Sequence, residues 1–127
     1  MADIHKNYNK TLKKLIDIIS NELPDEPLML TVRRKYMAAI TTDRTLPLTE
    51  TGRELFTFRD YIAEDKWDEL IDKDWEKDIS GDVDQKSIQH MIVLLRRIWG
   101  RYDPDEKKYV QKLIKTLLSE YTKSLMS

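Results

Sequence analysis

Residues 88–102 (IQHMIVLLRRIWGRY) constrain the fold more than any other stretch of this sequence. Their apolar side chains recur at steps of three and four, which places them on one face of an α-helix. Val93 and Leu94 widen that face, so residues 91–95 are apolar nearly all round. A helix of this kind has to be covered on several sides. We therefore predict a central helix over about residues 83–102, with the other helices packed around it.

The rest of the chain repeats the helical period and contains no convincing β-strand. Helices are predicted from about Lys6 to Glu22, from an N-cap at Asp25 over 29–40, from a capping box at Thr51 and Glu54 over 55–62, and over 67–75. We expect residues 41–48 (TTDRTLPL) to be irregular, and a second capping box at Asp82 and Gln85 to lead into the central helix. The sequence Asp103-Pro104-Asp105-Glu106 combines an N-cap, a first-turn proline and a capping glutamate. It predicts the start of a last helix that reaches about Leu125.

These patterns predict an all-α fold, in which residues 1–127 form a single compact bundle of five to six helices. A chain of 127 residues is long enough to bury a core without disulfides or metals. It has no cysteine, which excludes disulfides and thiolate chemistry. Its longest apolar run is far shorter than the roughly 20 residues that span a bilayer. The first ten residues lack the pattern of a signal peptide, so we expect a cytoplasmic protein that does not bind membranes.

The charge of −1 is unevenly distributed. From Asp60 to Asp84 there are eleven acidic residues and three lysines, a balance of −8, and the remaining residues carry +7. Such asymmetry bears on partners rather than on fold. It predicts a protein partner, or self-association in which the two regions pair between copies.

The usual catalytic inventory is sparse. The two histidines, His5 and His90, have no neighbouring ligands at zinc-site spacing, and no GxSxG elbow occurs. The three glycines, at 52, 81 and 100, cannot form a phosphate loop. We therefore predict no enzyme activity, no cofactor and no small-molecule substrate. One alternative is a calcium protein or a small enzyme with an unrecognised site, because residues 76–87 (EKDISGDVDQKS) imitate an EF-hand loop. That loop ends in Ser87 instead of a bidentate glutamate.

A nucleic-acid-binding module is the other alternative. Basic residues occur in both terminal helices, and these helices could present one basic face if they lie side by side. Acidic residues 60–84 would have to face away from the nucleic acid. The candidate contacts are Lys10, Lys13, Lys14, Arg33, Arg34, Arg96, Arg97, Arg101, Lys108 and Lys112.

Two tryptophans in the acidic segment are candidate protein contacts. Trp67 and Trp75 are eight residues apart and so lie near one face of a helix. An exposed tryptophan with a charged rim is typical of an interaction hot spot. The competing interpretation, which we favour, is that both anchor the acidic helix on the core.

Five stretches carry a resemblance to a group of proteins. They are LPDEPL (23–28), AAI (38–40), TDRTLP (42–47), LFTFRDYIAEDKWDEL (55–70) and KKYVQKLIKTLL (107–118). Together the sequence resembles small uncharacterised helical proteins of nucleocytoplasmic large DNA viruses. The resemblance implies a protein of the virion or viral factory, in the host cytoplasm, without a cofactor. The sequence thus predicts a non-enzymatic helical interaction or structural protein.

Overall fold

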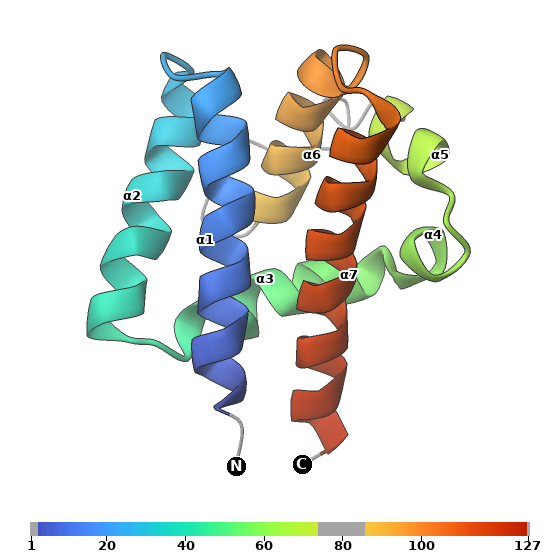
Figure 1. The fold of residues 1–127 in the computed structure, drawn as a ribbon. Helices are drawn as coiled ribbons and strands as arrows, with labels where there is room; N and C mark the ends of the chain where they lie inside the picture. The colour runs from blue at the N-terminus through green and yellow to red at the C-terminus, as the bar shows by residue number, and fades with distance from the viewer. Residues whose placement is uncertain (1–2, 74–85, 127) are drawn as a thin grey trace.

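The computed structural model describes residues 3–73 and 86–126, and this part of the chain forms seven helices and no strand (Figure 1). The prediction of an all-α fold is confirmed. The helices are α1 (Ile4–Glu22), α2 (Pro27–Thr42), α3 (Leu46–Thr57), α4 (Arg59–Ala63), α5 (Trp67–Asp72), α6 (Ser87–Trp99) and α7 (Pro104–Met126).

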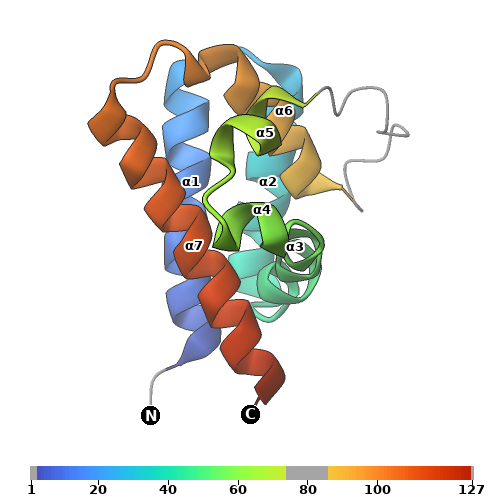
Figure 2. The ribbon, with the colours of Figure 1, turned by 90° about the vertical axis from the view of Figure 1, so that its right-hand side faces the viewer.

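The two long terminal helices, α1 and α7, lie side by side and run in opposite directions (Figure 1). Helix α2 packs against α1, and α3 crosses behind α1 and α7 close to the end where α1 begins and α7 ends. The short helices α4 and α5 follow α3 on the α7 side of the molecule (Figure 2). The sequence therefore places its first and last helices in direct contact.

Helix α6 is the covered helix that the apolar period predicts. It packs against α1, α2, α3 and α5. Within it only Arg96 and Arg97 are exposed, and the other eleven residues are buried. The helix begins at Ser87 and ends at Trp99, so residues 100–102 form a turn instead of extending it.

The helix predicted over 55–62 is two helices in the structure. Phe58 has φ −102° and ψ 11°, which ends α3 at Thr57 and lets α4 begin at Arg59. The buried side chain of Phe58 packs in the core at this break. This division gives seven described helices instead of five to six.

Two local predictions about helix starts are wrong. The N-cap residue of α2 is Glu26, not Asp25, and no side chain caps it. Residues 41–48 are not all irregular, because α3 begins at Leu46 with Pro47 in its first turn, where its missing N–H is tolerated. The predicted box at Asp82 and Gln85 lies outside the described residues.

The capping box at the start of α7 is confirmed. The Glu106 N–H donates to Asp103 Oδ1 at 2.8 Å, and the Asp103 N–H donates to Glu106 Oε1 at 3.1 Å. At the other terminal helix, Asp3 Oδ1 accepts the Lys6 N–H, so α1 begins at Ile4, two residues before its predicted start. The N-terminus of each long helix is therefore capped by side chains close to it in the sequence.

Candidate functional site

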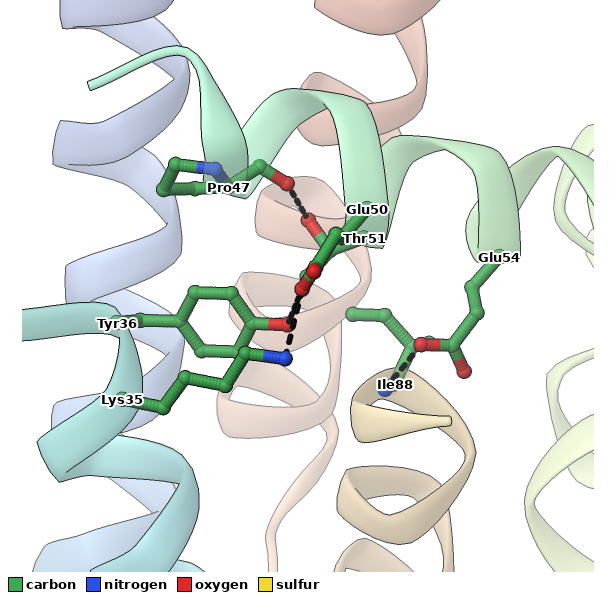
Figure 3. A network of polar contacts seen from close by, with 7 residues as sticks. All are labelled: Lys35, Tyr36, Pro47, Glu50, Thr51, Glu54 and Ile88. Carbon is green, nitrogen blue, oxygen red and sulfur yellow. Dashed lines mark hydrogen bonds and ion pairs between the residues drawn. The ribbon is translucent and has the colours of Figure 1, made fainter. Parts of the chain in front are cut away.

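A network of polar side chains links α2, α3 and α6 (Figure 3). Glu54 lies in α3, and its two carboxylate oxygens accept the N–H groups of Ile88 and Gln89, each at 3.0 Å. These N–H groups belong to the first turn of α6, which has no partner for them within the helix. The predicted capping box of Thr51 and Glu54 is therefore wrong, because Glu54 caps a different helix.

Glu50, one turn before Glu54, binds two residues of α2. Its Oε2 lies 2.7 Å from Lys35 Nζ and accepts the Tyr36 hydroxyl at 3.3 Å. Burial raises the pKa of Tyr36, so this phenol remains a neutral donor. Every acidic side chain of the network thus has partners on a neighbouring helix, and the network holds the bundle together.

Thr51 points from α3 towards α1. Its hydroxyl donates to the Pro47 carbonyl at 2.6 Å and lies 2.5 Å from the Tyr8 hydroxyl. Both Tyr8 and Thr51 have no exposed surface. A threonine inside α3 therefore fills a structural role in the core.

The enclosed space near the central helix is small and apolar. It holds about 10 Å³ and is lined by aliphatic residues and Phe58, among them Leu55, Leu70 and Met91. Among residues 3–73 and 86–126 no three histidine, aspartate or glutamate side chains are grouped to hold a metal ion. Residues 76–85, which carry most of the EF-hand-like pattern, are not among those described.

Trp67 is a core residue. Its side chain is only 4% exposed, and its indole N–H donates to Asp65 Oδ1 at 3.0 Å. The interpretation of Trp67 as an anchor of the acidic helix is confirmed, and its use as an exposed protein contact is excluded. Trp75 lies outside the described residues.

The candidate arginines are distributed over α2, α6 and the turn after α6. Arg33 pairs with Asp17 of α1 at 2.6 Å, and Arg97 of α6 pairs with Glu26 at 2.9 Å. Both guanidinium groups therefore form ion pairs with carboxylates from other elements, Asp17 in α1 and Glu26 at the N-cap of α2. Arg34, Arg96 and Arg101 are exposed on α2, on α6 and in the turn after α6.

The candidate lysines lie on the outer faces of the terminal helices. Lys10, Lys13 and Lys14 are exposed on α1, and Lys108 and Lys112 are exposed on α7. Lys108 and Lys112 share an exposed face of α7 with Lys115 and Lys123. The spacing of these four lysines, together with Ser119, places them along one face of α7.

An apolar groove adjoins this row of lysines. It holds about 470 Å³ between α4 and the C-terminal half of α7, and Ile62, Ala63, Leu118 and Met126 line it. Lys115, Ser119 and Lys123 belong both to this groove and to the lysine-bearing face of α7. We call the two together the lysine-rimmed groove. An apolar floor with a polar, charged rim is the usual anatomy of a protein interface.

The acidic segment reaches the rim of this groove. Asp65, in the turn before α5, lies 2.6 Å from Lys115 Nζ. Hydrogen bonding from Lys115 and from the Trp67 indole lowers the pKa of Asp65. Glu120 also lines the groove, 3.9 Å from Lys123 Nζ. Carboxylates therefore stand among the lysines on this surface.

Sequence reasoning missed part of the groove. The period of α7 identifies Lys115 and Lys123 as neighbours of Lys108 and Lys112, and that signal was available. No sequence pattern predicts that Ile62 and Ala63 lie beside α7, because their position follows from the break between α3 and α4 at Phe58.

No protein-family model matches this chain, and no match was found among curated proteins or solved structures. None of the described helices combines the length and the apolar character needed to cross a membrane.

Proposed function

We propose that this protein is a non-enzymatic interaction protein whose lysine-rimmed groove binds an acidic, amphipathic segment of a protein partner. The observation that carries the proposal is that the lysine-bearing face of α7 borders the apolar groove: Lys115 and Lys123 stand beside the floor formed with Leu118 and Met126. Acidic side chains of the segment would pair with the lysines, while its apolar side chains would cover the floor. The charge is complementary, and such complementarity favours association and specificity.

The same surface favours a protein over a nucleic acid. Asp65 and Glu120 stand among the lysines of the rim, so this surface is mixed in charge and lacks the continuous basic face that a phosphate backbone binds. The arginines Arg33 and Arg97, which would bind phosphates in bidentate fashion, are already paired with carboxylates. The apolar floor has no use in phosphate binding. On the sequence resemblance alone, the partner would be a component of a virion or viral factory.

The test is an NMR titration of the ¹⁵N-labelled protein with three probes at low salt. The probes are a synthetic helical peptide of leucine and glutamate at amphipathic spacing, the same peptide with lysine in place of glutamate, and duplex DNA. The proposal expects the acidic peptide alone to shift resonances of 61–63 and 108–126, with an affinity that falls as salt rises. Absence of these shifts with the acidic peptide, or equal shifts with the basic one, would overturn it.

Two charge-reversed variants sharpen the test. Lys112→Glu with Lys123→Glu changes the groove, and Lys13→Glu with Lys14→Glu makes the same charge change on α1. The groove pair should weaken peptide binding about tenfold or more, because two attractive contacts become repulsive, while the α1 pair should change it little. If DNA shifts the groove resonances and both pairs weaken it equally, the nucleic-acid alternative replaces the proposal.

A further inference from the structure

A second pocket lies where the end of α1 meets the start of α7. It holds about 430 Å³, within the range of small-ligand sites, and shares no lining residue with the lysine-rimmed groove. Its polar lining consists of Asn21, Glu22, Asp105, Glu106 and the two tyrosines Tyr102 and Tyr109. Ile18 and Val110 supply aliphatic surface.

The three carboxylates of this pocket differ in how far the surrounding structure stabilises their negative charge. Asp105 and Glu106 occupy the first turn of α7, where negative charge is favourable, and Glu106 also accepts the Asp103 N–H. Glu22 occupies the last turn of α1, where the helix dipole is negative and no basic residue is present. It forms no ion pair with any residue of the described chain. Glu22 is therefore a carboxylate placed where a cation would be stabilising.

Tyr102 is the buried polar residue of this pocket. Its side chain lines the pocket, is only 8% exposed, and has a hydroxyl without a hydrogen-bond partner among the described residues. Burial and the charges of Glu22 and Glu106 raise the pKa of Tyr102 to about 12, so the hydroxyl is neutral. The Trp99 ring contacts the Tyr102 ring edge to face, with centroids 6.3 Å apart. A buried, unpartnered hydroxyl costs free energy unless a ligand supplies the partner.

We propose that this pocket binds an alkylammonium group. The ammonium would bind Glu22 and Glu106, with Tyr102 Oη accepting one of its N–H bonds. The half-exposed ring of Tyr109 offers an aromatic face to the same charge, and Ile18 and Val110 accommodate the aliphatic stem. An anion is disfavoured because three carboxylates and no lysine or arginine line the pocket.

Titration with n-butylammonium, followed by NMR, tests the proposal. Resonances of 18–22 and 102–110 should shift with n-butylammonium and not with n-butanol, which has a similar length and no charge. Two further probes identify the source of the group: spermidine as a free polyamine and N-acetyl-lysine methylamide as a protein side chain. Tighter binding of one over the other assigns the source. No shift with any of the three amines, or equal shifts with butanol, would overturn the proposal.

Matched variants separate binding from folding. Glu22→Gln with Glu106→Gln removes both charges and keeps the capping box, since glutamine also serves at that position. It should weaken n-butylammonium binding about fivefold or more, whereas Glu69→Gln on the exposed surface of α5 should not change it. Tyr102→Phe should weaken binding about threefold without lowering the melting temperature, because the hydroxyl has no partner in the fold. A Tyr102→Phe variant that loses stability and keeps its amine affinity would assign the hydroxyl to the fold and contradict its role.

Discussion

Glu54 caps the helix that contains Ile88, although the two residues are 34 positions apart: Glu54 Oε1 accepts the Ile88 N–H at 3.0 Å, and Oε2 accepts the next N–H. The contact joins α3 to the first turn of the most buried helix. A cap usually comes from the residue that precedes its helix, but Lys86 at that position makes no side-chain cap. The start of α6 therefore depends on the placement of α3.

Replacing Glu54 with alanine should lower the free energy of unfolding by about 1–3 kcal/mol, because two N–H groups of α6 lose a charged acceptor. Glu54→Gln should cost less, since its amide oxygen can still accept one of the two. Urea denaturation of both variants measures which of them loses more stability. The proposed role of Glu54 is contradicted if alanine and wild type unfold at the same urea concentration.

Glu54 also gives the stability a pH dependence of defined sign. Burial raises the pKa of Glu54 above its usual 4.5 and outweighs the opposing effect of the Ile88 and Gln89 donors. The folded protein then holds this proton more tightly than the unfolded chain does, so the contribution of Glu54 falls as pH rises through the folded pKa. The unfolding free energy of wild type minus that of Glu54→Gln should therefore decrease from about pH 4 to pH 7. An increase over that range would show that the N–H donors dominate.

The hydrogen bond between Tyr8 and Thr51 joins α1 to α3 without any solvent exposure. Thr51→Val should lower the free energy of unfolding by about 1–2 kcal/mol, because it leaves the buried Tyr8 hydroxyl without its partner. Tyr8→Phe should lower it by less, because the Thr51 hydroxyl keeps its bond to the Pro47 carbonyl. The double variant should lose less than the sum, with a coupling of about 1 kcal/mol. Additive losses in a double-mutant cycle would mean that the two hydroxyls act separately.

Two glycines provide a matched pair for the packing of α3 on α7. A β-carbon at Gly52 would collide with the ring of Tyr121, whereas one at Gly100 would have no neighbour within 4 Å. Gly52→Ala should therefore lower the free energy of unfolding by about 1–3 kcal/mol. Gly100 has φ −68° and ψ −16°, which alanine also adopts, so Gly100→Ala should be neutral or stabilise by up to about 1 kcal/mol. Thermal unfolding compares the two, and equal effects would contradict this account of the crossing.

The sequence predicts what is determined locally. The apolar period of residues 88–102 identifies the buried helix, and Asp103 with Glu106 identifies the start of α7 because both partners of that capping box are three residues apart. The same spacing at Thr51 and Glu54 predicts a box that does not exist. There the helix already begins at Leu46, and Glu54 is used by a helix that sequence distance gives no means of identifying.

The candidate surfaces likewise combine features that are determined locally with contacts between distant parts of the chain. The lysines of α7 are recognisable from their spacing on one face, but their apolar neighbours Ile62 and Ala63 come from a separate helix. The pocket at Glu22 and Tyr102 requires the end of α1 to meet the start of α7, a contact between distant parts of the chain. That a residue is a tryptophan also does not show whether it is an exposed interaction hot spot or a buried anchor in the core. Burial decides this for Trp67, and burial depends on the packing of α5 on α6.

Trp67 should therefore behave as a core residue in a direct test. Its side chain is 4% exposed, so Trp67→Ala should lower the free energy of unfolding by about 3–5 kcal/mol through lost burial and a residual cavity. Leu30, which is 39% exposed on α2, serves as the control, and Leu30→Ala should change stability by less than about 1 kcal/mol. Chemical denaturation followed by circular dichroism measures both variants. If Trp67→Ala kept full stability, α5 would not be anchored by its indole, and the acidic turn at Asp65 would lose the support that holds it beside Lys115.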